Sequence, residues 1–360
     1  MKKYLTILFI GTVLFASCKK KDDGVEFEED PMTASGPTTV PITGAEWVTP
    51  LPDMDDKIDA LAVYEDKLFL SQLYFSNGQF AISSEYDGTE QTYHVQSLGT
   101  GQNITRFRQF DGVLYGLAPI GFVGSYSFDT ENREWNGFAS NPGMFNNISD
   151  LLLVDGKTII AGPGGAGDPH IWLREGGNTE PMGDGFDGTV NALANYNGNI
   201  IAGGSFGFSG STVIENIASW NGSSWEVMAS GLNGTVWDLV EYDGKLIATG
   251  SFELSGSTAC NGIAMWDGTS WSAIGGSLEG GAGNGGRVLY VHETELFVGG
   301  DFDGAGGESS PNVAKWTGTE WVSLAGGAPA IVGSIAVFED KLYIANKFSS
   351  TGSDFLLKLQ

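Results

Sequence analysis

Five residues with side chains suited to ligand binding stand at the start of short apolar segments that recur along the chain. Each occupies the second or third position of its segment and breaks the apolar consensus there: Arg106, Asp150, Trp237, Asp238 and Arg287. Charged and aromatic side chains at the loop-bearing end of a rigid scaffold can bind a ligand. The alternative is a hydrated rim that binds nothing. Because side chains alternate along a strand, only one of Trp237 and Asp238 should face the common space.

Catalytic chemistry needs a convergent set of titratable groups, and the sequence singles out none. The chain has three His residues, His94, His170 and His292, which fall in the first, third and sixth of the repeats described below. That scatter argues against a His-based acid–base pair and against a His-rich metal site. Carboxylates are plentiful, so a two-carboxylate glycosidase stays open. We expect no cofactor and lean towards a protein that is not an enzyme.

One short segment is a weak calcium candidate. Asp301 and Asp303 stand in the run Asp301-Phe302-Asp303-Gly304. The run lacks the full spacing of ligands and glycine that an EF-hand loop uses. An acidic turn is therefore the favoured interpretation, and no other metal site is predicted.

The segments that carry these residues belong to a repeat. A turn such as Asp243-Gly244 between two apolar runs predicts a tight β-hairpin. The turn recurs roughly every 45 residues, a period typical of propeller blades, at Glu65, Asp111, Asp155, Asn197, Asp243, Glu293 and Glu339. In the fifth unit we predict strand A over 236–242, strand B over 246–250, strand C over 263–266, and strand D from Trp271.

The two ends of the repeat array complement each other. The last unit, from Val332 to Leu359, has no Trp-containing strand of its own, whereas Glu46-Trp47-Val48 stands alone before the first unit. Pairing these segments would close a ring and hide the edge strands. We therefore predict an all-β fold: a seven-bladed β-propeller over residues 45–360, closed by pairing an N-terminal strand with the last blade.

Aromatic residues recur at fixed places in the units. Phe206, Phe252, Phe302 and Phe348 share one position, and Tyr86, Phe128 and Trp172 lie near the strand C position that Trp220 and Trp316 occupy. Aromatic rings can stack on sugars, but recurrence in every blade favours packing between blades.

The most regular units resemble a known class of repeat. Gly203-Gly204-Ser205-Phe206 and Gly299-Gly300-Asp301-Phe302 are each followed by a strand and a Trp pair, Trp220 with Trp225 and Trp316 with Trp321. These features resemble kelch or galactose-oxidase-type propeller repeats, and still more the repeats of the fungal cortical polarity-marker family. Blade 5 departs from the pattern with Thr249-Gly250. The resemblance implies a propeller and carries no single activity.

The first residues have the organisation of a bacterial export signal. Lys2-Lys3, an apolar run from Leu5 to Ala16, and small residues before Cys18 resemble a lipoprotein signal peptide with a lipobox. Residues 1–17 are the expected signal peptide, and Cys18 is the expected site of acylation, palmitate included. Lys19-Lys20-Lys21-Asp22-Asp23 is similar to the signal that sends Bacteroidota lipoproteins to the outer face of the outer membrane. Residues 18–44 are the expected acylated and disordered tether.

The charge and the cysteine content limit the interactions expected of the chain. The formal net charge is −26, which repels phosphate backbones and argues against nucleic acid. Once Cys18 is acylated, Cys260 has no partner for an intramolecular disulfide. The leading hypothesis is a non-catalytic, lipid-anchored protein of the outer membrane, facing the exterior and presenting a propeller face to a glycan or protein. Two alternatives stay open: a polysaccharide lyase or glycosidase of the propeller type, and a structural subunit of an outer-membrane complex.

Overall fold

The computed structural model describes residues 46–50, 58–76, 79–96, 104–118, 125–137, 148–162, 168–281, 285–346 and 356–359. The chain divides into two compact units, Met1–Pro41 and Ile42–Gln360, and every described residue belongs to the second. The predicted signal peptide, Cys18 and the tether lie outside the described residues. No helix in the described part of the chain is long and apolar enough to span a bilayer.

The described residues form seven four-stranded antiparallel sheets that follow one another along the chain. Blades 1 to 3 are built from β2 (Ile58–Tyr64), β3 (Lys67–Ser76), β4 (Gln79–Tyr86) and β5 (Gln91–Gln96); β6 (Arg106–Phe110), β7 (Val113–Leu117), β8 (Ser125–Asp129) and β9 (Glu134–Gly137); and β10 (Asp150–Val154), β11 (Lys157–Ala161), β12 (Ile171–Glu175) and β13 (Asn178–Pro181). Blades 4 and 5 are built from β14 (Thr189–Tyr196), β15 (Asn199–Ser205), β18 (Ile217–Trp220) and β19 (Trp225–Val227), and from β20 (Val236–Tyr242), β21 (Lys245–Gly250), β24 (Ile263–Trp266) and β25 (Trp271–Ala273).

Blade 6 contains β27 (Gly285–His292), β28 (Glu295–Asp301), β31 (Val313–Trp316) and β32 (Trp321–Ser323), and blade 7 contains β33 (Val332–Phe338), β34 (Lys341–Asn346), β35 (Leu356–Leu359) and β1 (Trp47–Val48). Short accessory strands extend blades 4 to 6: β16 (Phe208–Ser209) with β17 (Thr212–Val213), β22 (Leu254–Ser255) with β23 (Thr258–Ala259), and β26 (Leu278–Glu279) with β29 (Gly304–Ala305) and β30 (Glu308–Ser309).

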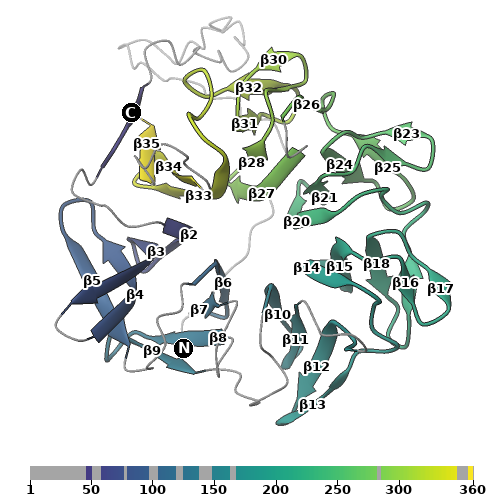
Figure 1. Ribbon diagram of the computed structural model, residues 1–360, viewed down its shortest axis with the longest axis horizontal. Helices are drawn as coiled ribbons and strands as arrows, with labels where there is room; N and C mark the ends of the chain where they lie inside the picture. Colours follow the sequence, from purple (N-terminus) through teal and green to yellow (C-terminus); the bar gives the residue numbers. More distant parts are fainter. Residues whose placement is uncertain are drawn as a thin grey trace, which may run out of the picture. The chain divides into compact units, whose positions relative to one another are not determined.

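The sheets stand around a central axis with strand A of each blade innermost, as Figure 1 shows for β2, β6, β10, β14, β20, β27 and β33. Each innermost strand packs against the innermost strands of both neighbouring blades, and β33 packs against β2, so the ring is closed. The all-β propeller fold predicted from the repeat is confirmed.

The hairpin between strands A and B has the same backbone form in every blade. The residue at the Asp243 position has a φ between 49° and 52° in all seven turns. In most blades the next residue also has positive φ, such as Gly244 at 67°, which is the type I′ geometry that matches strand twist. Asp, Asn and Gly tolerate this region best, and the first turn position holds Asp or Asn in four blades and Glu in the other three.

The ring closes between the two segments that the sequence predicts to pair. β1 pairs antiparallel with β35, Trp47 opposite Leu359 and Val48 opposite Lys358. The Trp47 indole Nε1 donates a hydrogen bond to the Gly327 carbonyl at 2.8 Å. The N-terminal segment therefore supplies the outer strand of blade 7 and covers the edge of β35.

The recurrent Trp residues of strand D join neighbouring blades. Trp225, Trp271 and Trp321 are 3–4% exposed, and each indole N–H donates to a backbone carbonyl that precedes its own blade, 2.9–3.3 Å away. The side chains of Phe206, Phe252 and Phe302 are buried too, while Phe348 lies outside the described residues. The packing interpretation of these aromatics is confirmed, because neither set presents a ring to solvent.

The two glycines at the end of strand B lie where other parts of the protein come too close to allow a side chain. A Cβ on Gly204 would lie 2.0 Å from the Thr189 carbonyl oxygen of its own blade, and a Cβ on Gly203 would lie 2.6 Å from Val236 of the next. In blade 5, Thr249 replaces the first glycine, and the residue opposite it in blade 6 is Gly286. A Cβ on Gly286 would meet the Thr249 hydroxyl at 2.0 Å. A large residue on one blade is thus matched by a small one on the next.

Strand C of blade 3 differs from that of the regular blades. Trp172 lies two residues before the register position that Trp220 occupies, and Arg174 stands at that position. His170 directly precedes β12, and its φ is 61°. Cys260 is fully buried, and burial raises the pKa of its thiol.

Candidate functional site

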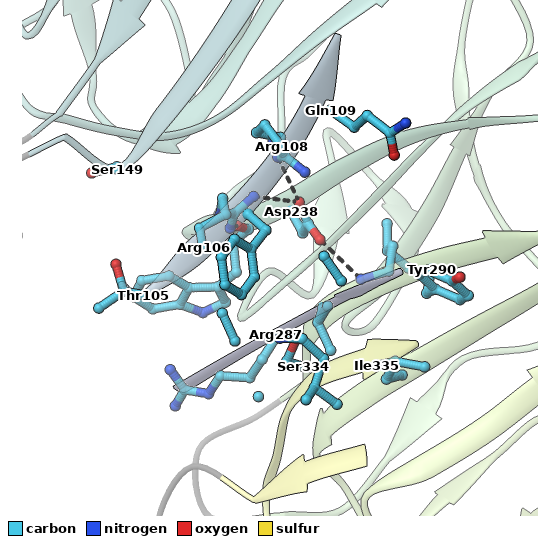
Figure 2. Close-up of a pocket in the computed structure, with 18 of the residues that line it drawn as sticks. Thr105, Arg106, Arg108, Gln109, Ser149, Asp238, Arg287, Tyr290, Ser334 and Ile335 are labelled. Carbon is cyan, nitrogen blue, oxygen red and sulfur yellow. Dashed lines mark hydrogen bonds and ion pairs between the residues drawn. The ribbon is translucent and has the colours of Figure 1, made fainter. Parts of the chain in front are cut away.

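The innermost strands enclose a cavity of about 550 Å³ on the axis of the ring, shown in Figure 2. Its lining side chains come in layers, because the blades present equivalent positions at equal depth. In the register of β20, where Trp237 is the second residue and Asp238 the third, the equivalent second positions hold Thr105, Ser149, Asn191 and Arg287, and the equivalent third positions include Arg106 and Ser334. Four of the five predicted site residues line this cavity, and Asp150 lies against it through its ion pairs with Arg106 and Arg108.

Trp237 and Asp238 both border the cavity, as do runs of consecutive residues on other innermost strands. The strand that carries them has a β-bulge: the register between β20 and β21 shifts between Val236 and Asp238. Blades 4, 6 and 7 have a register shift at the same position. A bulge interrupts the two-residue alternation and redirects side chains.

Two arginines and two aspartates form an ion cluster across the channel. Arg108 binds the Asp150 carboxylate through both Nε and Nη2, each at 2.6 Å. Arg106 Nη1 donates to Asp238 Oδ1 at 2.9 Å and lies 3.5 Å from Asp150 Oδ2. Because the arginines belong to blade 2 and the aspartates to blades 3 and 5, the cluster ties together strands from different parts of the ring.

Each aspartate also bonds the backbone of the next blade. Asp150 Oδ2 accepts the Leu193 N–H at 2.8 Å, and Asp238 Oδ2 accepts the Leu289 N–H at 2.9 Å. Ser334 does the same across the closure, where its hydroxyl accepts the Leu61 N–H at 2.9 Å. The third position of strand A therefore supplies an inter-blade acceptor in three blades.

Asp150 and Arg108 each favour the charged form of the other. Burial works against a charge on Asp150, which is 0% exposed, but the Arg108 and Arg106 charges and the bonds from Arg108 and the Leu193 N–H outweigh it and lower its pKa. Burial likewise opposes the charge on Arg108, and the Asp150 and Asp238 carboxylates outweigh it and raise the pKa of the guanidinium. These four side chains satisfy one another, so Asp150 and Asp238 are structural acceptors rather than free ligand-binding groups.

Arg287 differs from the other two arginines of the cavity. Its Cζ lies 5.1 Å from the centre of the Trp237 ring, a cation–π contact between blades 5 and 6. Its Nε is buried and has no hydrogen-bond partner among the described residues. In Figure 2 the Arg287 guanidinium lies apart from the dashed lines that converge on Asp238. Arg287 and Trp237 are therefore the side chains of the cavity best placed to meet a ligand.

The cavity offers little for acid–base catalysis. No His is among its lining residues in the described part of the chain. Its Tyr290 hydroxyl accepts the Val337 N–H at 3.3 Å, and burial raises the pKa of that hydroxyl. A phenol that stays protonated is a poor general base.

The three His residues lie apart from the cavity. His94 is buried between blades 1 and 2, where its Nε2 lies 3.2 Å from Glu85 Oε2 and its ring stacks on Phe69. Burial lowers the pKa of His94 to about 4, against a smaller opposing effect of its bond to the Arg133 carbonyl. Lys67 and Arg133 both pair with Glu85, so that carboxylate is already neutralised. His292 lines a separate cavity of about 430 Å³.

The weak calcium candidate lies at the outer part of blade 6. Asp303 accepts the Gly281 N–H at 3.2 Å through Oδ2, and Asp301 is the last residue of β28. No group of three or more His, Cys, Asp or Glu side chains in the described part of the chain is arranged to hold a metal ion. Cys18 lies outside the described residues, so its predicted acylation stays a prediction.

Sequence reasoning missed Arg108, whose bidentate bond makes it the centre of the ion cluster. The signal was present: Arg106 and Arg108 are two residues apart on one strand and so share a face. It also missed the polar ring of Thr105, Ser149 and Asn191, because ordinary polar residues at a strand end do not stand out from a turn.

Comparison with solved structures supports the fold. The chain resembles the WD40 β-propeller domain of Doa1 with a TM-score of 0.53 and 13% identity, over 85% of this chain and 92% of that one. It resembles a chain of a mitotic checkpoint complex with a TM-score of 0.52 and 15% identity, over 99% and 98%. It also resembles the computationally designed Ika8 protein with a TM-score of 0.51 and 14% identity, over 85% and 96%. At these identities the likeness concerns the propeller fold alone.

No protein-family model matches the chain, and no curated protein matches it in sequence.

Proposed function

We propose that this protein is a non-catalytic binding module that takes a glycan at the mouth of its central channel. The observation that carries the proposal is the pairing of Trp237 with Arg287 in a cavity of about 550 Å³. That volume is in the range of ligand sites, and an indole face with nearby polar groups suits a sugar ring. The remaining charges of the cavity are satisfied within the ion cluster, so they hold the scaffold rather than the ligand.

The test is binding of a panel of neutral and charged oligosaccharides to the purified full-length protein, measured by isothermal titration calorimetry. Trp237→Ala should abolish binding of whichever glycan binds the wild type. Phe208→Ala is the matched control, because Phe208 is an exposed aromatic residue (45% exposed) in β16, away from the cavity. Binding that survives Trp237→Ala, or that depends equally on Phe208, would refute a channel site.

The rival function is a polysaccharide lyase or glycosidase. Arg287 and Tyr290 share the cavity, which is the arrangement a lyase would use to neutralise a carboxylate and abstract a proton. The raised pKa of Tyr290 argues against it as a base. Product formation from a polysaccharide panel that is lost in Arg106 or Arg287 variants would establish the enzyme and overturn the binding proposal.

The repeats are proposed to be of the kelch type. The close approach at Gly203 and Gly204, and the tilted Trp220–Trp225 ring pair with centroids 5.2 Å apart, give the shared motif a physical reason. The equivalent pair in blade 6 has its centroids 5.4 Å apart.

The location is proposed to be the outer membrane, with the propeller facing the exterior and Cys18 acylated. The support is the leader: a basic start, a short apolar run, small residues before Cys18, and a following lysine and aspartate cluster. Two or more acyl chains would anchor the protein stably. Replacing Cys18 with Ser should move the protein from the membrane fraction to the soluble fraction, and a variant that stays with membranes would refute the anchor.

A structural subunit of an outer-membrane complex is the second alternative. The hairpin of β16 and β17 exposes Phe208 and Val213, at 45% and 58%, on the periphery of blade 4. Stoichiometric co-purification of partners that is lost in a Phe208→Ser variant would favour this alternative, and a monomer in detergent would count against it.

A further inference from the structure

Positively charged residues are scarce in this chain, and most of its arginines line the central cavity. The chain has five Arg residues and a net charge of −26. Three of the five, Arg106, Arg108 and Arg287, line the central cavity. A protein so acidic gains no solubility from cations on its axis, so these three need a structural or a functional reason.

Two of the three have a structural reason. Arg108 is held by both oxygens of Asp150, and Arg106 by Asp238, with bonds of 2.6–2.9 Å. Two carboxylates therefore neutralise two guanidinium groups within the cluster. The third charge, on Arg287, has no carboxylate within ion-pair distance among the described residues.

Arg287 is oriented by an aromatic face rather than by a carboxylate. A guanidinium group that lies over a ring uses its flat face for that contact, and its N–H donors point outward in its own plane. One of these donors, Nε, is buried without a hydrogen-bond partner in the described part of the chain. Because Nε is covered by protein atoms, a ligand in the cavity would meet the two Nη groups, which also have no hydrogen-bond or ion-pair partner in the part of the chain that the structure describes.

The ligand that fits these donors is a carboxylate. A carboxylate meets the planar guanidinium fork with two parallel charge-assisted bonds, which a neutral hydroxyl cannot do. The polar neighbours suit the rest of a sugar ring. Asn191 donates its Nδ2 to the Val236 carbonyl at 2.9 Å, which leaves its Oδ1 as an acceptor towards hydroxyls, and Thr105 and Ser149 line the same cavity.

We propose that the ligand of the channel site is an acidic glycan, whose uronic-acid carboxylate binds Arg287 while its sugar ring packs beside Trp237. This inference rests on the proposed glycan-binding function and adds the chemical class of the ligand. The ion cluster of blades 2, 3 and 5 forms the rigid floor against which that sugar ring is held.

The experiment compares two probes that differ only in charge: tetragalacturonate and its fully methyl-esterified form. Binding of each to the purified full-length protein is measured by calorimetry at pH 7. The wild type should bind the acid at least about tenfold more tightly than the ester, in line with a charge-assisted bond. Arg287→Met should remove that preference, so that acid and ester bind with similar affinity. Arg287→Lys, which keeps the charge but loses the fork, should retain part of the preference.

The control is Arg174→Met, which removes an arginine of β12 that does not line the cavity and should leave both affinities unchanged. Near-UV circular dichroism establishes whether each variant is folded. If Arg287→Met is unfolded, the comparison of acid and ester affinities is made with Arg287→Lys instead. Equal affinity for acid and ester in the wild type, or a preference that persists in Arg287→Met, would overturn the inference and leave the glycan-binding proposal standing. Binding of neither probe would also overturn it, and the neutral oligosaccharide panel then decides the broader proposal separately.

Discussion

Replacing Asp150 with Asn should destabilise the propeller strongly although the two side chains have almost the same shape. The Asp150 carboxylate is 0% exposed and accepts two bonds from Arg108 at 2.6 Å and one from the Leu193 N–H at 2.8 Å. An amide has one acceptor oxygen, and both carboxylate oxygens of Asp150 accept from Arg108, so the NH2 group of Asn would face an Arg108 donor in either orientation. Breaking a buried ion pair by removing one partner costs about 3–5 kcal/mol.

We therefore expect Asp150→Asn to lower the free energy of unfolding by about 4 kcal/mol at pH 7, with the nearby Asp238 carboxylate, 3.7 Å from Arg108, offsetting part of the loss. Urea denaturation followed by Trp fluorescence measures this, provided that the m-value does not change. Because the pKa of Asp150 is lowered on folding, its stabilisation is present above its unfolded pKa and is lost as pH falls through the folded value.

The matched control is Asp243→Asn, the same substitution at an exposed hairpin turn whose φ of 49° suits Asn. It should change stability by less than about 0.5 kcal/mol. The double variant Arg108→Met with Asp150→Asn should lose less than the sum of the single variants, because no unpaired charge is left behind. If Asp150→Asn were within about 1 kcal/mol of the wild type, the ion cluster would not hold the blades together and our account of the third strand A position would be refuted.

Three further predictions concern closure, pH and packing between blades. Trp47→Ala removes the indole bond of the closing strand and half-buried apolar area, and should lower the free energy of unfolding by about 3 kcal/mol in urea denaturation, whereas no effect would mean that β1 does not close the ring. Burial lowers the pKa of His94 from its ordinary 6.5 to about 4, so below about pH 6.5 the unfolded chain binds a proton that the folded chain does not. The free energy of unfolding should therefore fall by up to about 3 kcal/mol between pH 6.5 and pH 4. His94→Gln should flatten that part of the pH profile, and an identical profile would contradict the assignment. Gly286→Val should cost about 1–3 kcal/mol by collision with Thr249, and Thr249→Gly should recover part of that loss; additive losses would show that the two positions do not touch.

The architecture was readable from the chain because it depends on local chemistry that repeats. The first position of the hairpin turn has positive φ in all seven units, and it is occupied by Asp or Asn in four of them and by Glu in three. Trp225, Trp271 and Trp321 mark strand D of blades 4 to 6, where each indole is buried and bonds to a carbonyl just before its own blade. Closure by Trp47 could be inferred because an array short of one strand at one end carries that strand at the other.

Much of the site could not be derived in this way. The directions of the side chains at the start of β20 depend on a bulge, and the bulge arises from how β20 meets β21 rather than from any residue type. The compensation between Thr249 and Gly286 joins two blades, so neither residue alone indicates it.

The repeat, the strands, the turns and the pairing of the ends can be predicted from the residues alone, because each follows from the conformational preferences of neighbouring residues and the burial of a periodic apolar face. Which charges meet on the axis depends on the folded ring. Arg106 and Asp238 are 132 residues apart in the chain, yet Arg106 Nη1 lies 2.9 Å from Asp238 Oδ1. Arg287 lies over the Trp237 ring and has no carboxylate partner in the described residues. Charge pairing depends on distance through space, and ring closure sets that distance.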